Sequence, residues 1–227
     1  IKAQIYQELK IYLKAEEIYK KIHPEHYLYV EGQKNIVIIK KNTKKFNEAE
    51  KILIELIDVY PNENSLIVLL AYLYQTNKQY NKAVKFYTLI IQQPNINNNL
   101  LWQIYYRRGI CYERSNKWSK AENDFLQALK HYEYALSKEP GNADYNAYIG
   151  YVHRRLGNWD ETLKFLEKAL ALDPNDLAVW GGLVSTYLFL KKYDKINYIA
   201  LNKKLGTISP EDGSLYSDRA SLTFWLE

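Results

Sequence analysis

The sequence predicts an all-α solenoid, a stack of repeated helical units, because several kinds of residue keep one period. Tyr12, Phe46 and Tyr80 lie 34 residues apart. The same interval separates a set of alanines and two sets of bulky apolar residues, namely Ala15, Ala49 and Ala83, then Tyr19, Leu53 and Tyr87, and then Ile22, Leu56 and Ile90. A period held at four positions indicates structural copies that each bury an apolar face against the next copy.

Composition and charge argue against some classes of protein, such as disulfide-stabilised ones, but do not select a function. Hydrophobic residues make up 47% of the 227-residue chain and charged residues 25%, as is usual for folded globular chains. The net charge of +5 is a mild bias towards acidic partners, whereas proteins that depend on phosphate contacts usually have a stronger basic stripe. The single cysteine excludes an intramolecular disulfide framework.

No segment is long enough to predict a membrane-spanning helix. The longest uncharged apolar stretches run from Leu66 to Tyr74 and from Leu177 to Leu190. Both fall short of the roughly 20 residues that a bilayer requires. No signal segment opens the chain, but the chain begins at Ile1 and not at methionine, so its start says nothing about export. The sequence therefore does not decide between a cytoplasmic and a bacterial periplasmic location.

The clearest single unit is the segment 143–176, in which the small and turn-forming residues each have a mechanical role. Gly150 allows two helices to approach closely, Gly157 closes a first helix, and Ala169 keeps a packing seam narrow. Pro174 ends the second helix. This pattern resembles the tetratricopeptide repeat, a helix–turn–helix unit of about 34 residues.

The resemblance extends over nearly the whole chain, and it implies a right-handed α-solenoid of about six repeats. Three residues of the clearest unit depart from the usual pattern, since Asn146 replaces an aromatic, His153 a tyrosine and Thr162 an alanine. We expect the repeats at about residues 1–29, 30–63, 64–97, 102–130, 143–176 and 177–205. A loop and a further helix are expected over residues 206–227, as a cap or as part of a truncated seventh repeat.

Two interruptions disturb the period. From Ala83 to Ala121 the interval is 38 residues, and an enlarged loop between repeats explains the four surplus residues. From Gly109 to Gly150 the interval is 41 residues, which is seven too many. Seven residues are almost two helical turns, so a longer second helix would keep its apolar stripe inward. The alternative, which we favour from the sequence, is a seam near residues 130–131 at which residues are absent.

By resemblance to this family, the first helices of the repeats line a concave groove that binds partners. Their outward positions hold Lys34, Lys41 and Gln75 together with a set of tyrosines and arginines. As groove residues that bind a peptide or partner we predict Tyr72, Tyr106, Arg107, Arg114, Tyr148, Tyr151, Arg154 and Arg155. Tyrosine and arginine are enriched at binding hot spots, and arginine can pair bidentately with carboxylates. The alternative is that tyrosine is only this chain's usual aromatic and that the arginines complement helix dipoles.

Other types of site find little support in the sequence. Chaperone-binding members of the family hold a terminal carboxylate with lysine and asparagine pairs over three repeats, and that pattern is absent here. His23 and His26 flank a proline and a glutamate and lack a third metal ligand. Cys111 is expected to be a small buried hydrophobe and not a nucleophile. The groove residues do not recur from repeat to repeat as a helical-repeat code for RNA would require.

The sequence thus predicts a non-catalytic scaffold without a cofactor or metal, which binds a peptide or partner protein with a bias towards acidic ones. Nucleic acid is not the expected partner. Self-association through the apolar face of the sixth repeat is a further option. The alternative function is a repeat module of a larger bacterial envelope, secretion or polysaccharide-export protein, or of a glycosyltransferase-linked assembly, whose other domain is missing from this sequence.

Overall fold

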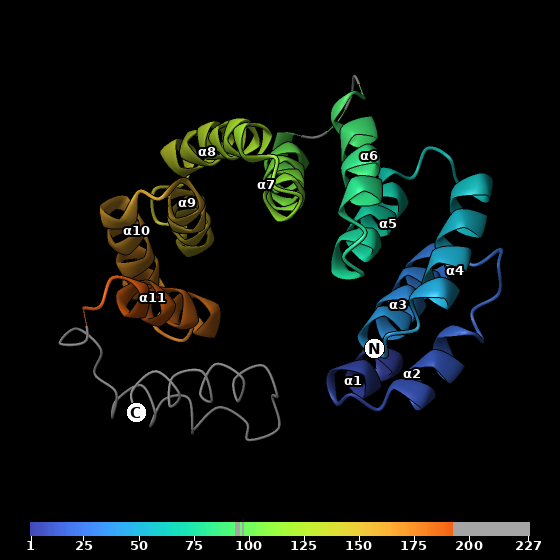
Figure 1. Cartoon of the computed structure of the whole chain (residues 1–227). Helices are drawn as coiled ribbons and strands as arrows, with labels where there is room; N and C mark the ends of the chain where they lie inside the picture. The colour runs from blue at the N-terminus through green and yellow to red at the C-terminus, as the bar shows by residue number, and fades with distance from the viewer. Residues whose placement is uncertain (94–95, 97, 193–227) are drawn as a thin grey trace. The chain divides into compact units, whose positions relative to one another are not determined.

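A computed structural model describes residues 1–93, 96 and 98–192, and within these residues it has eleven α-helices and no strand (Figure 1). The helices are α1 (Lys2–Glu8), α2 (Tyr12–Tyr19), α3 (Tyr29–Asn42), α4 (Phe46–Val59), α5 (Asn64–Thr76), α6 (Tyr80–Ile91), α7 (Asn98–Arg114), α8 (Trp118–Lys138), α9 (Ala143–Leu156), α10 (Trp159–Leu172) and α11 (Leu177–Phe189). The predicted all-α fold is confirmed. The second helix of the sixth repeat and the helix expected over residues 206–227 lie outside the described residues.

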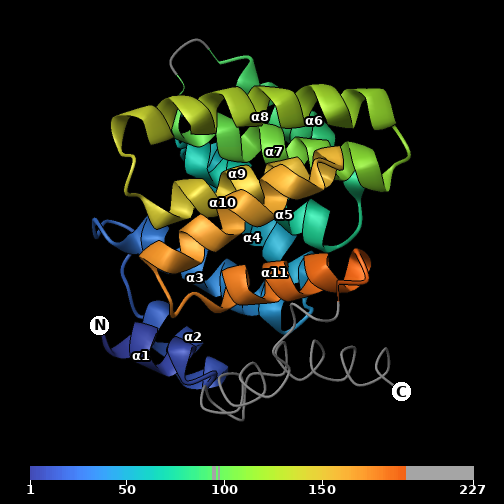
Figure 2. The same ribbon diagram turned by 90° about the vertical axis from the view of Figure 1, so that its left-hand side faces the viewer.

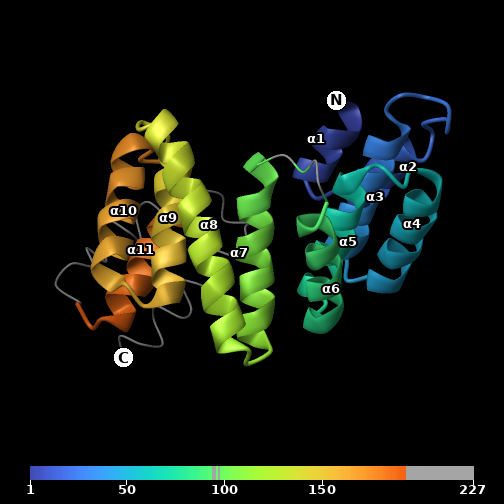
Figure 3. The ribbon, with the colours of Figure 1, turned by 90° about the horizontal axis from the view of Figure 1, so that it is seen from above.

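The chain divides into two compact units, unit 1 from Ile1 to Ala128 and unit 2 from Leu129 to Glu227. Within each unit the helices form antiparallel pairs, as α5 and α6 do in unit 1 and α9 and α10 do in unit 2 (Figure 1, Figure 3). In unit 2, α11 packs against both α9 and α10 (Figure 2). Paired helices that stack on the next pair are the architecture of a solenoid.

Unit 1 is held together by the residues that keep the repeat period. Ala15, Ala49 and Ala83 have no exposed surface, so the backbone of each second helix approaches its neighbours closely at that point. Leu53 and Tyr87 are also fully buried one helical turn further on. The period therefore marks the positions at which each second helix is enclosed by other helices.

In unit 2 the expected roles of two glycines are confirmed. A Cβ atom added to Gly150 would lie 2.8 Å from the side chain of Leu166 and 3.3 Å from the backbone nitrogen of the same residue. A larger residue would therefore push α9 away from α10. Gly157 follows the end of α9 with a φ of +77°, the left-handed conformation that closes many helices.

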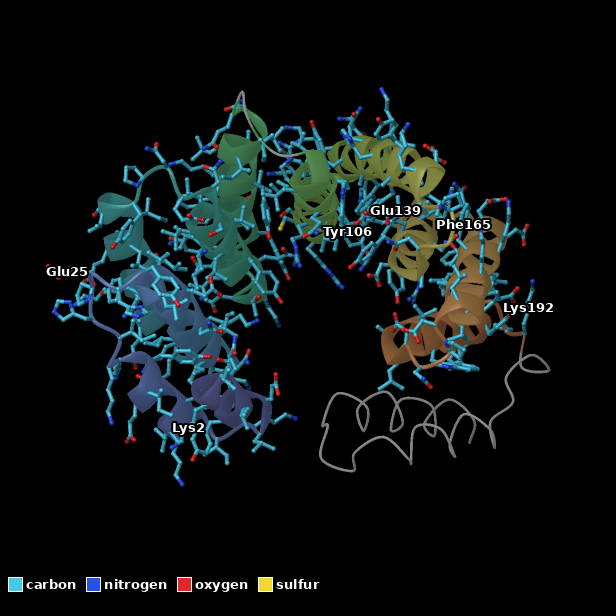
Figure 4. All side chains as sticks on the ribbon, turned by 180° about the vertical axis from the view of Figure 1, so that it is seen from behind. Lys2, Glu25, Tyr106, Glu139, Phe165 and Lys192 are labelled. Atoms are coloured by element: carbon cyan, nitrogen blue, oxygen red, sulfur yellow. The ribbon has the colours of Figure 1, made fainter. Side chains whose placement is uncertain are left out.

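The three departures of the fifth repeat are all buried, and each has a partner in or directly before its own repeat. The hydroxyl of Thr162 donates to the carbonyl of Asn158 at 2.9 Å. The amide nitrogen of Asn146 donates to a backbone carbonyl one turn earlier at 2.8 Å. The ring of His153 stacks on Phe165 of α10 with 5.8 Å between centroids, and burial lowers the pKa of this imidazole (Figure 4 labels Phe165). A polar residue at these places is therefore compatible with the packing.

The second interruption of the period is taken up by α8, which runs without a break through residues 130 and 131. The structure thus has the longer second helix and not the seam that we favoured from the sequence. The buried residues of this helix explain why, because Ala121, Phe125, Ala128 and Tyr132 follow one another at spacings of three and four residues. Such spacings keep one face of a helix inward along its whole length.

The turns within the repeats share one backbone conformation. Each of the six described turns has one residue of positive φ, and these residues are Lys10, Lys44, Lys78, Asn116, Gly157 and Lys191. Glycine adopts this conformation without a steric cost, whereas a residue with a Cβ atom loses about 1 kcal/mol there. Four of the six turns nevertheless use lysine, with φ between 55° and 61°.

A buried ion pair connects three consecutive helices of unit 1. The guanidinium of Arg108 in α7 donates two hydrogen bonds of 2.7 Å to the carboxylate oxygens of Asp124 in α8. It donates a third, of 3.0 Å, to the hydroxyl of Thr88 in α6. Asp124 is only 1% exposed, and the rings of Tyr105 and Tyr112 lie over the guanidinium. This bidentate geometry is the strongest form of an arginine–carboxylate contact.

Removing one partner of this pair should destabilise the fold severely. We expect Asp124→Ala to lower the free energy of unfolding by about 3–5 kcal/mol, because it leaves a buried guanidinium without its carboxylate. Replacing both partners, by Arg108→Met with Asp124→Leu, should recover most of that loss. Urea unfolding followed by circular dichroism measures both values. A double variant no more stable than Asp124→Ala would contradict this account.

Exchanging lysine for glycine at a left-handed turn should stabilise the chain. We expect Lys78→Gly to raise the free energy of unfolding by about 0.5 kcal/mol, because relief of the Cβ clash exceeds the added freedom of the unfolded chain. The reverse exchange, Gly157→Lys, should destabilise by a similar amount, since a Cβ atom there meets nothing within 4 Å and only the backbone conformation matters. Thermal or urea unfolding provides the measurement, and a loss of stability in Lys78→Gly would be the contrary result.

Candidate functional site

Two of the predicted partner-binding residues meet in unit 1, and a third cation joins them. The guanidinium of Arg107 in α7 lies over the ring of Tyr72 in α5, with 4.5 Å from Cζ to the ring centroid. The ammonium of Lys41 in α3 lies over the same ring, also at 4.5 Å. The helices α3, α5 and α7 are the first helices of three successive repeats, so each repeat contributes one residue. We call Lys41, Tyr72 and Arg107 the cation–tyrosine cluster.

The two cations of the cation–tyrosine cluster dominate its electrostatics. Burial raises the pKa of the Tyr72 phenol, but the charges of Lys41 and Arg107 outweigh it, so the pKa lies below its ordinary value. Among the residues that the structure describes, neither cation forms an ion pair with a carboxylate. Both cations are half-buried, which weakens their screening by water and salt. Two like charges near one ring, without an internal counter-ion, favour the binding of an anion.

Beside the cluster lie two buried residues that the sequence identified only as parts of the period or of the core. The hydroxyl of Tyr87 donates to the side-chain oxygen of Gln75 at 2.8 Å. Burial raises the pKa of this phenol, against the opposing charge of Arg107. Cys111 is fully buried, and burial raises the pKa of its thiol to about 12, with Arg107 opposing. The prediction that this cysteine is a small buried residue of the core is confirmed.

Two other predicted residues take part in packing. Tyr106 of α7, which Figure 4 labels, lies against Phe125 of α8, with tilted rings whose centroids are 5.8 Å apart. Tyr151 of α9 packs against α11, where a Cβ atom added to Gly182 would lie 2.8 Å from the tyrosine ring. Both tyrosines are half-buried. These contacts give both of them a structural role, which their position in the repeat did not predict.

The remaining predicted residues are spread over the ends of two first helices. Tyr148 of α9 is 36% exposed and stacks on Tyr132 of α8, with 5.2 Å between ring centroids. Arg154 and Arg155 lie in the last turn of α9, and Arg114 lies in the last turn of α7. Cations in the last turn of a helix complement the helix dipole. This is the alternative to partner binding that the sequence left open for the arginines. In unit 1 the structure thus joins Tyr72 to Arg107, whereas Arg114 lies apart at the helix end.

The described residues show neither a metal site nor a membrane-spanning helix. Over residues 1–93, 96 and 98–192, no three histidine, cysteine or acidic side chains gather as they would around a metal ion. None of the helices described has the length and apolar character needed to cross a bilayer. His23 and His26 are exposed, and each accepts a hydrogen bond from a backbone N–H two residues further on.

Fold and site together define a class of protein, a solenoid of helical hairpins that presents side chains from successive first helices. Comparison with known families gives that class its name. Residues 65–93 and residues 106–176 each match a family model described as the tetratricopeptide repeat. The chain thus contains tetratricopeptide repeats over these residues, as its sequence pattern indicated.

Two relatives share stretches of sequence with the chain. Heat shock protein STI1 of Saccharomyces cerevisiae is 32% identical over 108 residues, which are 48% of this chain and 17% of that protein. Superkiller complex protein 3 of Homo sapiens is 32% identical over 74 residues, which are 33% of this chain and 4% of that protein. The chain therefore corresponds to a small part of the length of each relative.

Solved structures of low sequence identity share the fold. A tetratricopeptide-repeat protein of Parabacteroides merdae aligns with a TM-score of 0.61 at 21% identity, covering 98% of this chain and 83% of its own. A thermophilic tetratricopeptide-repeat protein of Thermus thermophilus aligns with a TM-score of 0.63 at 18% identity, covering 86% of this chain and 98% of its own. At such identities the likeness concerns the fold alone.

Removing both cations of the cation–tyrosine cluster should raise the pKa of Tyr72. In Lys41→Gln with Arg107→Gln, burial acts on the phenol without the opposing charges, so the pKa should move above its ordinary value. Titration of ¹³C-labelled tyrosine by NMR measures it, with Tyr72→Phe to assign the signal. The control is Lys85→Gln with Lys168→Gln, which removes the same charge from two exposed sites on second helices and should leave the pKa unchanged. An unchanged pKa in the cluster variant would refute the arrangement.

Proposed function

We propose that the protein is a non-catalytic scaffold that binds an acidic segment of a peptide or partner protein at the cation–tyrosine cluster of unit 1. Tetratricopeptide repeats suggest a protein-interaction scaffold in general, and the cluster supplies the chemistry for a particular class of ligand. The observation that carries the proposal is the placement of two cations on one tyrosine ring without a carboxylate partner among the described residues.

Neighbouring cations on the same helices show how this chain neutralises a charge that serves its own fold. Lys40 is 8% exposed and forms ion pairs of 2.9 and 2.7 Å with two glutamates. Arg108 pairs bidentately with a buried aspartate. Lys41 and Arg107 stand one position away from these residues and have no such partner among the described residues. On both first helices, one cation is therefore satisfied internally and the adjacent one is available to a ligand.

The three side chains of the cluster would act in different ways on a bound acidic segment. Arg107 offers a planar fork of donors that matches a carboxylate, and Lys41 adds a point charge. The ring of Tyr72 offers an aromatic surface to an apolar side chain next to the acidic one. Because water is partly excluded from this place, each attraction is stronger than the same contact on an open surface. The ligand is thus a segment in which acidic and apolar side chains alternate.

Unit 2 offers a second set of predicted contacts on α9, which we propose as a separate binding region. Tyr148, Arg154 and Arg155 combine an exposed aromatic ring with two cations. Arg154→Ala with Arg155→Ala tests this set independently of unit 1. The role of a module in a larger envelope, secretion or glycosyltransferase-linked assembly remains a prediction from the sequence, as does self-association.

The proposal predicts selective, salt-sensitive binding of acidic peptides. A fluorescent peptide in which glutamate alternates with leucine should bind, and its glutamine counterpart should bind on the order of tenfold more weakly or less well still. Lys41→Gln with Arg107→Gln should weaken binding of the acidic peptide by a similar factor and flatten its salt dependence. Fluorescence polarisation over a range of salt concentrations measures these effects.

The control for this experiment is again Lys85→Gln with Lys168→Gln, which loses the same charge on second helices. It should retain the affinity of the unmodified chain. Equal affinity of the unmodified chain for both peptides would show that the ligand is not acidic. Unchanged affinity in the cluster variant would move the binding site elsewhere.

A further inference from the structure

A row of lysines follows the turns within the repeats of unit 1. In the first three repeats the residue of positive φ is Lys10, Lys44 and Lys78, and in the fourth Asn116 takes this conformation. Over the four turns, residues 9–11, 43–45, 77–79 and 115–117, the sequence has five lysines and no aspartate or glutamate. We call these five the turn-edge lysines, and they are Lys10, Lys44, Lys45, Lys78 and Lys117.

The four turns lie along one edge of unit 1. Because consecutive helices run antiparallel, every connection from a first helix to its second helix falls at the same end of the stack (Figure 3). Contacts between neighbouring repeats show that this edge is continuous. The ammonium of Lys117 donates to the side-chain oxygen of Asn81 at the beginning of α6, at 3.2 Å. In turn, Lys82 of α6 lies 3.9 Å from Glu50 near the beginning of α4.

Two carboxylates close to this edge, Glu16 and Glu48, make their shorter contacts with lysines outside the row. Glu16 forms ion pairs of 2.6 and 2.9 Å with two lysines outside the row. Glu48 lies 2.7 Å from Lys40, while its distance to the turn-edge Lys45 is 3.8 Å. In the part of the chain that the structure describes, Lys44 and Lys78 form no ion pair. Lys44 and Lys78 therefore carry positive charges that the described part of the fold does not neutralise.

Lysine is an unfavourable residue for the backbone conformation of these turns. Its presence therefore indicates that the lysine side chain has a function outside the turn. Each left-handed lysine costs about 1 kcal/mol that glycine would not. The fifth repeat uses Gly157 at the equivalent place. Lys44 and Lys78 are exposed, and neither is part of the core clusters of unit 1. The benefit of their charge must then come from something that this edge faces.

Exposed apolar side chains accompany the charges at both ends of the row. Leu9 is 63% and Ile11 40% exposed in the first turn, and Trp118, directly after the fourth turn, is 62% exposed. Lysines near an anionic bilayer contribute about 1 kcal/mol each, and tryptophan prefers the level of the lipid headgroups. A nucleic acid would attract the lysines but would make no favourable contact with exposed leucine and isoleucine side chains. Phe46 and Tyr80, beside the central turns, are half-buried and make poor platforms for base stacking.

We propose that the turn edge of unit 1 docks on an anionic phospholipid surface. The turn-edge lysines contact the headgroups, and Leu9, Ile11 and Trp118 reach the boundary between headgroups and acyl chains. This contact is peripheral and requires no spanning helix. It involves the turns and not the cation–tyrosine cluster on the first helices, so it is independent of the proposed peptide binding.

Vesicle sedimentation tests the proposal with the full 227-residue chain. Vesicles of phosphatidylcholine with one third phosphatidylserine should bind the protein, vesicles of phosphatidylcholine alone should not, and high salt should release it. Lys44→Gly with Lys78→Gly should weaken partitioning roughly thirtyfold, as two lost lysines imply. Since glycine suits both turns, this variant is expected to be at least as stable as the unmodified chain, and misfolding cannot account for its loss of binding.

Two further variants separate this surface from general charge and from the other site. Lys85→Gln with Lys168→Gln, the control with equal charge loss, should change partitioning by about twofold at most. Lys41→Gln with Arg107→Gln should bind vesicles as well as the unmodified chain. Trp118→Ala should weaken binding without altering its dependence on salt, because it removes an apolar contact and not a charge.

Several outcomes would overturn the proposal. One is the absence of binding to the anionic vesicles, and another is equal binding to vesicles with and without phosphatidylserine. Full binding by Lys44→Gly with Lys78→Gly would show that the row is not the contact. Duplex RNA that displaces the vesicles and loses affinity in the same variant would assign the edge to a nucleic acid instead.

Discussion

Each copy of the repeat brings the backbone of its second helix against neighbouring helices, and a small side chain is needed where they cross. Ala15, Ala49 and Ala83 meet this requirement in three successive copies with no exposed surface. Thr162 takes the same place in the fifth copy, where its hydroxyl bonds to a backbone carbonyl and so adds no unsatisfied group. Close crossings set the separation of adjacent copies. That separation is what allows side chains from α3, α5 and α7 to meet on the ring of Tyr72.

The fold could be predicted because its determinants are local and repeated, whereas the site depends on contacts between helices distant in sequence. The same excess of seven residues is compatible with absent chain or with a longer helix, and only the buried stripe that ends at Tyr132 distinguishes them. Periodicity placed Tyr72 and Arg107 correctly on first helices. It could not show that Tyr106 packs on α8, because a half-buried tyrosine and an exposed one occupy equivalent positions. Nor could it show which of two adjacent lysines, Lys40 or Lys41, would find carboxylates.

The two surfaces proposed for unit 1 use positive charge in different physical regimes. Lys41 and Arg107 are half-buried, so their attraction is short-ranged, directional and weakly screened. The turn-edge lysines Lys44 and Lys78 are exposed on flexible stems, and their attraction is long-ranged, non-directional and easily screened. A scaffold with both kinds of site could hold a soluble acidic segment on one face while an edge rests on a charged interface. Ionic strength would then separate the two contacts.

The only cysteine of the chain lies within unit 1, at no solvent exposure and beside Arg107. Because burial raises the pKa of its thiol to about 12, the reactive thiolate is almost absent in the closed state at neutral pH. Alkylation therefore requires local separation of the helices around Cys111. The alkylation rate then reports the free energy of that local opening. A ligand bound at the neighbouring cluster would hold the helices closed and slow the reaction. The alkylation rate of Cys111 in the unmodified chain thus measures local opening within unit 1 only.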